Sequence, residues 1–204
     1  MNILQINSSA RAFTNGQGSQ STRLANELVE TLRANAAGAT LTLRDLTANP
    51  HPALDEATLG ALFTPADART SEQHARVALD QALIDEVQAA DVIVIGVPMV
   101  NFGITSQLKN WIDAIAKAGV TFKYTETGPV GLAGGKRVIV VSSRGGVRQD
   151  ANALDLHEQT VDVVFRFLGL TDITYVRAHG LAMGPEAREA SLVAANGAVA
   201  ALAA

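Results

Sequence analysis

The chain has 204 residues and a formal net charge of -4, which fits one acidic domain that buries roughly 70% of its unfolded surface. It has no cysteine, and this excludes disulfides, iron–sulfur clusters, thiolate zinc sites and a thiol nucleophile. Any redox chemistry therefore needs a bound cofactor. The acidic balance and the lack of a signal peptide or a long apolar stretch predict a cytoplasmic protein without nucleic-acid or membrane partners.

Five short runs rich in β-branched residues predict strands. Three of them are almost continuously apolar, which is typical of strands covered on both faces of a parallel sheet. The five runs are residues 3–6, 41–46, 92–97, 138–141 and 173–176.

The intervals between these runs predict helices. Leu24, Leu28 and Leu32 repeat at helical spacing in a helix that we expect to stop near Gly38. Further helices are expected over 77–87, 104–115 and 154–168, and from Pro185 to the end of the chain. Strict strand–helix alternation predicts an α/β fold of three layers, with a five-stranded parallel sheet in the flavodoxin-like order 2-1-3-4-5. We expect one domain over residues 1–204, with insertions near 49–70 and 120–136.

In such a sheet, ligands bind beyond the carboxyl ends of the strands, where the strand order reverses. The loop after the first strand, residues 7–22, is rich in hydroxyl, amide and glycine groups and leads into a helix. This favours a phosphate cradle, although a plain capped helix start has a similar composition. A triphosphate loop is excluded because no lysine occurs in the first hundred residues, and Ser21 replaces the third glycine of the dinucleotide fingerprint. A single phosphate fits better.

The loops after the third and fourth strands complement this cradle. Residues 96–103 combine apolar side chains, an amide and Pro98, which suits the wall of a flat heteroaromatic ring or, alternatively, an ordinary packed turn. Gly145 and Gly146 allow backbone N–H groups to approach a ligand, although a plain glycine turn has the same sequence. Together the three loops predict a site for flavin mononucleotide (FMN).

Five ordered motifs resemble a known family across essentially the whole chain. The chain is similar to the FMN-dependent NAD(P)H azoreductases, also described as NADH:quinone oxidoreductases, which have a flavodoxin-like fold. The motifs are Ser-Gln-Ser at 19–21, residues 98–102, 107–111, 119–129 and Ser-Arg-Gly-Gly at 143–146.

The resemblance implies a role for each segment. The phosphate would be held by Ser8 or its neighbour Ser9, with Ser19, Gln20 and Ser21. The ring would lie against Pro98, Met99, Val100, Asn101 and Phe102, and its pyrimidine end against Ser143, Arg144, Gly145 and Gly146. Many members have an aromatic residue in place of Val100, so substrate preference is expected to differ here. The resemblance also implies a homodimer with Tyr124 and Phe167 near the substrate cavity.

The expected activity is hydride transfer from NADH or NADPH to FMN, followed by reduction of a quinone or an aromatic azo compound in a ping-pong mechanism. The chemistry would occur on FMN, so no catalytic side chain is expected. The four histidines lack metal-ligand spacing, which predicts no metal site and places them at the surface or its boundary. Two alternatives are a non-enzymatic FMN electron carrier and a nucleotide-binding regulatory module without flavin.

Overall fold

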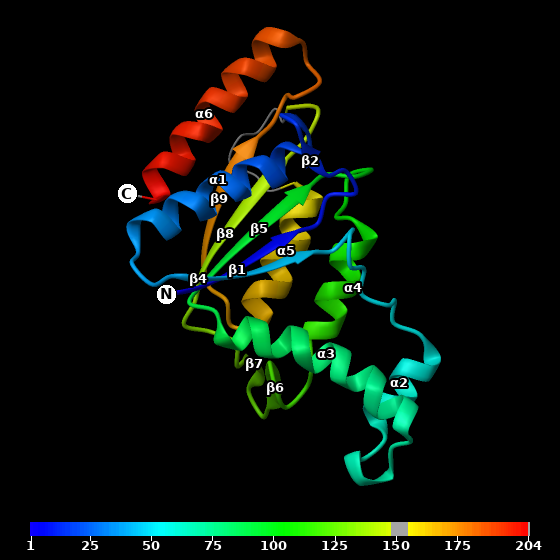
Figure 1. Ribbon diagram of the computed structural model, residues 1–204. Helices are drawn as coiled ribbons and strands as arrows, with labels where there is room; N and C mark the ends of the chain where they lie inside the picture. Colours follow the sequence, from blue (N-terminus) through cyan, green and yellow to red (C-terminus); the bar gives the residue numbers. More distant parts are fainter. Residues whose placement is uncertain (148–154, 204) are drawn as a thin grey trace.

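The computed structural model describes residues 1–147 and 155–203, and its centre is a five-stranded parallel sheet (Figure 1). The strand order is β4-β1-β5-β8-β9, which confirms the predicted order 2-1-3-4-5. The strands are β1 (Asn2–Asn7), β4 (Thr40–Asp45), β5 (Val92–Pro98), β8 (Arg137–Ser143) and β9 (Asp172–Ala178).

Helices cover both faces of this sheet, as the apolar strands require. Ile93 and Ile95 face one core, while Val92 and Val94 face the other. The first core is closed by α3 (Ser71–Ala89), α4 (Ser106–Ile115) and α5 (Leu156–Phe167), and the second by α1 (Gln20–Asn35) and α6 (Pro185–Ala203). The five predicted helices are confirmed, with residue 154 outside the described residues. Within the part of the chain that the structure describes, no helix is long and apolar enough to cross a membrane.

The predicted loops contain structure that the apolar patterns did not reveal. The 49–70 segment holds α2 (Glu56–Phe63) and the short 3₁₀ helix η1 (Ala66–Ala68). Two small hairpins also form, β2 (Phe13–Thr14) with β3 (Gln17–Gly18), and β6 (Phe122–Thr125) with β7 (Gly128–Gly131). The first hairpin turns at Asn15-Gly16, where both residues have positive φ, as a two-residue type I′ turn requires.

Candidate functional site

A cavity of about 340 Å³ opens at the carboxyl ends of β1, β5 and β8, at the point where the strand order reverses. The three loops singled out in the sequence meet there, joined by the segment that leads into α6. The lining residues are Ser9, Ala10, Arg11, Gly18, Ser19, Gln20, Pro98, Met99, Val100, Ser143, Arg144, Gly145, Leu181, Ala182 and Arg188.

The start of α1 forms one wall of this cavity. Ser19 is the N-cap residue: its hydroxyl accepts a hydrogen bond from the Thr22 N–H at 3.2 Å and lies 3.1 Å from the Ser21 hydroxyl. The Gln20 side-chain oxygen accepts from Arg23 Nε at 2.8 Å, which leaves the amide NH₂ available. The free N–H groups of the first helical turn carry the positive end of the helix dipole. This wall therefore favours an anion.

Two of the predicted phosphate ligands do not line the cavity. Ser8 is fully buried, and its hydroxyl donates to the Gly96 carbonyl at 2.6 Å, which ties β1 to β5. Ser21 is also fully buried and reaches the site only through Ser19. Ser9 does line the cavity, and its hydroxyl accepts from the Arg11 N–H at 3.1 Å. Of the two adjacent serines, Ser9 is thus the candidate ligand.

The loop after β5 forms an apolar wall and an exposed tip. Pro98, Met99 and Val100 line the cavity, and the Met99 N–H donates to the Ser143 carbonyl at 2.8 Å, so this loop is joined to the next one. Asn101 and Phe102 form the turn at the tip, with φ values of 47° and 70°. The Phe102 side chain is 72% exposed, and neither residue lines the cavity. Positive φ at two non-glycine residues stores backbone strain, which is typical of functional loops.

The turn after β8 is held by backbone hydrogen bonds to the segment before α6. The carbonyls of Arg144, Gly145 and Gly146 accept from N–H groups of residues 180–182 at 2.7 to 3.2 Å. With these carbonyls engaged, the N–H group of Gly145, which lines the cavity, has no partner among the described residues and is available to a ligand. The Arg144 guanidinium lies by the cavity in an ion pair with Asp155, at the start of α5. Gly146 supports the turn without lining the cavity.

A buried polar cluster lies beneath this turn. The Ser142 hydroxyl is 2.9 Å from His157 Nε2 and 3.3 Å from His179 Nε2, and Glu158 pairs with Arg177. Burial lowers the pKa of His157 to about 4. Burial alone would raise the pKa of Glu158, but hydrogen bonds from His179, Arg177 and Ser142 outweigh it and lower that pKa to about 2. The expectation that the histidines lie at the surface or its boundary is therefore wrong for His157, which is fully buried.

Tyr124 and Phe167 do not reach the cavity of their own chain. They surround Phe122, whose ring centroid lies 5.6 Å from that of Tyr124 and 4.6 Å from that of Phe167. Figure 1 shows the β6–β7 hairpin beyond the amino ends of the strands, whereas the start of α6 lies at their carboxyl ends. Phe167 ends α5, whose start at Asp155 lies beside the cavity, so it is about 18 Å along the helix from the site.

Six lining residues were not among the predicted site residues, and two of them, Ala10 and Gly18, lie in the loop after β1 that the sequence had singled out. Arg11 follows Ser9, while Leu181, Ala182 and Arg188 come from the segment before α6 and from its first turns. The segment before α6 is held at the cavity by its backbone hydrogen bonds to the turn after β8, and such bonds leave no motif in the sequence.

Comparison with known proteins agrees with this architecture. A family model described as flavodoxin-like fold matches residues 1–202. The FMN-dependent NADH:quinone oxidoreductase 1 of Cupriavidus pinatubonensis is 60% identical over 99% of this chain and 96% of its own length. An FMN-dependent NADH:quinone oxidoreductase of Aromatoleum aromaticum is 57% identical over 96% of both chains. A solved FMN-dependent NADH-azoreductase from Bacillus anthracis, in complex with FMN, superimposes with a TM-score of 0.87 at 26% identity over 100% of both chains. The chain therefore belongs to the flavodoxin-like fold family, together with these FMN-dependent NADH:quinone oxidoreductases.

Proposed function

We propose that this protein is an FMN-dependent NADH:quinone oxidoreductase that also reduces aromatic azo compounds. The observation that carries the proposal is the single cavity in which an anion-binding helix start, an apolar wall and a glycine turn meet. Two relatives, 60% and 57% identical, are named FMN-dependent NADH:quinone oxidoreductases, which supports FMN as the cofactor, NADH as the donor and a quinone as the acceptor. The azo substrate is supported by the solved azoreductase.

The lining residues suit the parts of FMN, which has one phosphate at the end of a chain and a flat ring. We assign the phosphate to Ser9, Ser19 and the amide of Gln20. The ring is assigned to the apolar wall at 98–100, and its polar pyrimidine edge to Ser143 and the turn at Gly145. A cavity of this size is in the range that encloses a small organic ligand.

When bound, FMN supplies the redox chemistry by taking a hydride from NADH and passing the electrons to the acceptor. The protein binds and orients the reactants. N–H groups of the Gly145 turn would stabilise negative charge at the pyrimidine edge, because preorganised donors cost little reorganisation. Pro98, Met99 and Val100 exclude water from one face. We propose that NADH and the acceptor use the other face in turn, which gives a ping-pong mechanism.

We further propose that the active protein is a homodimer. Leu156 and Val163 are spaced at helical positions i and i+7 on α5 and are 61% and 67% exposed, and Phe167 follows at i+11. Tyr124 is 75% exposed. Tyr124 and Phe167 lie away from the cavity of their own chain. A second copy packed on the apolar stripe of α5 would place them near a substrate bound in the partner subunit.

Steady-state kinetics of the full chain with FMN test the proposal. NADH oxidation is expected to depend on added benzoquinone, and varying both substrates should give parallel double-reciprocal lines. An aromatic azo dye should serve as a second acceptor, and NADPH in place of NADH measures the donor preference. A protein that binds FMN but never oxidises NADH with benzoquinone would instead be an electron carrier.

A further inference from the structure

We propose that Arg11 and Arg188 form an anion-binding pair that recognises the terminal phosphate of the flavin and selects FMN over riboflavin. The inference rests on the proposed function and extends it to two residues that the azoreductase-like motifs do not include. Arg11 lies in the loop after β1, and Arg188 lies in the first turns of α6.

The two guanidinium groups have no partner in the part of the chain that the structure describes. Neither side chain forms a hydrogen bond or an ion pair there, whereas Arg144, the third arginine of the cavity, is neutralised by Asp155. No aspartate or glutamate is among the described lining residues. The cavity thus has two uncompensated positive charges.

Helix geometry places Arg188 above the start of α1. Arg23 Nη2 donates to Asn196 Oδ1 at 3.1 Å, which aligns these two positions of α1 and α6. Arg188 precedes Asn196 by eight residues, or about 12 Å along the helix, whereas Ser19 precedes Arg23 by only about 6 Å. The first turns of α6 accordingly extend beyond the start of α1 (Figure 1), and Arg188 and Ser19 line the same cavity.

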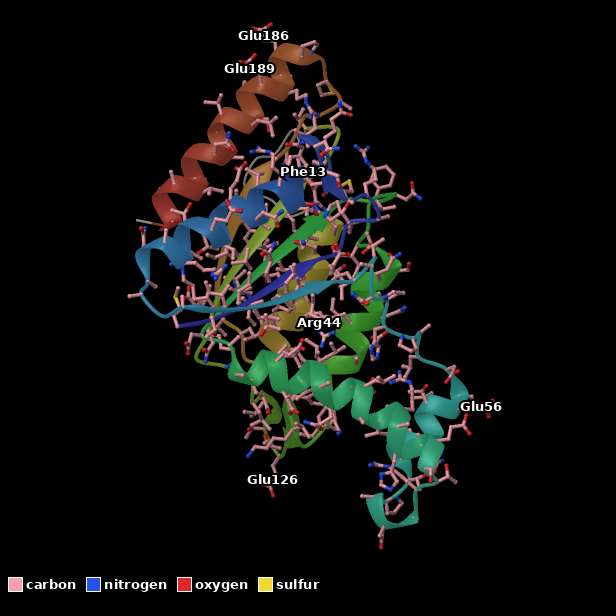
Figure 2. The ribbon with its side chains drawn as sticks, in the orientation of Figure 1. Phe13, Arg44, Glu56, Glu126, Glu186 and Glu189 are labelled. Carbon is pink, nitrogen blue, oxygen red and sulfur yellow. The ribbon has the colours of Figure 1, made fainter. Side chains whose placement is uncertain are left out.

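The acidic neighbours of Arg188 face elsewhere. Figure 2 shows Glu186 and Glu189 at the outer end of α6, directed away from the sheet. Helical positions one and two residues apart do not share a face, so these carboxylates do not neutralise Arg188. Neither of them forms an ion pair with a described residue.

The charge of the ligand explains why two arginines are useful here. A phosphate monoester carries roughly -1.5 to -2 charges at neutral pH. The helix dipole offers roughly half a positive charge, and the hydroxyls of Ser9 and Ser19 offer none. Two guanidinium groups supply the remaining positive charge, and riboflavin, which lacks the phosphate, gains nothing from them.

The test is a fluorescence titration of the full chain, freed of flavin by dialysis, with FMN and separately with riboflavin. Arg11→Gln and Arg188→Gln should each raise the Kd for FMN about tenfold and leave the Kd for riboflavin unchanged. Arg33→Gln is the matched control, because Arg33 is exposed in the last turn of α1, about 21 Å along the helix from Ser19. It removes the same charge and should alter neither Kd.

Two other outcomes would overturn the inference, and they differ in whether the proposed function also fails. If both variants keep the wild-type Kd for FMN, or weaken FMN and riboflavin equally, the arginines do not recognise the phosphate, while the proposed function stands. If the wild-type chain takes up neither flavin, the proposed function fails and this inference fails with it.

Discussion

The Ser19→Ala variant distinguishes two roles of the Ser19 hydroxyl, that of a phosphate ligand and that of an ordinary helix cap. In Ser19→Ala, α1 loses the bond from the Thr22 N–H, and N-cap loss typically costs about 1 kcal/mol. If the same hydroxyl also holds an anionic phosphate, a further charge-assisted bond of about 1.5–3 kcal/mol is lost on binding, which raises the Kd for FMN at least about tenfold.

Thr70→Ala is the matched control. Thr70 caps α3 through a bond of the same length, 3.2 Å from the Gln73 N–H, and does not line the cavity. Urea unfolding should show a similar loss of stability in both variants, and FMN fluorescence titration should show weaker binding in Ser19→Ala alone. Equal destabilisation with an unchanged Kd in Ser19→Ala would mean that the hydroxyl is only a cap, and the phosphate assignment would be refuted.

Three further predictions concern buried charge and close packing. Because the pKa of His157 is lowered to about 4 from 6.5, the unfolded chain binds more protons below pH 6.5, so stability falls as the pH drops through this range. Urea unfolding should show a loss of about 2 kcal/mol from this residue between pH 7 and pH 5, absent in His157→Gln, and an equal pH slope in the variant would contradict it. Gly131→Ala would place a Cβ 2.1 Å from the Gly169 nitrogen and should destabilise the fold by about 1–3 kcal/mol, whereas Gly197→Ala, with open space around it in α6, should stabilise it by up to about 1 kcal/mol, both measured by urea unfolding. Gly145→Val would place a Cβ 3.2 Å from the Ala182 Cβ and should abolish FMN uptake with a loss of about 1–3 kcal/mol in the unfolding free energy, and normal flavin content would contradict the role of the turn.

The centre of the sheet was predictable because β1, β5 and β8 are buried on both faces. Continuous apolar runs such as 92–97 are typical of covered parallel strands, and the strand order then determines which loops meet. The hairpin at Asn15-Gly16 had a usable turn signal, but its strands are only two residues long and leave no apolar pattern.

Details within the site depended on contacts that the sequence does not encode locally. Ser8 and Ser9 are adjacent and chemically identical, yet the Ser8 hydroxyl donates to the Gly96 carbonyl whereas Ser9 lines the cavity. The burial of His157 depends on Ser142 from a different element. Arg188 enters the site only because α6 extends beyond α1, which is a property of helix packing.

The absorbance spectrum of the purified full chain, after incubation with FMN and removal of the excess, tests the central claim most directly. We expect a protein-bound flavin band at about 450 nm that NADH bleaches under anaerobic conditions and benzoquinone restores. A protein that retains no flavin, or a bound flavin that NADH leaves oxidised, would contradict the account.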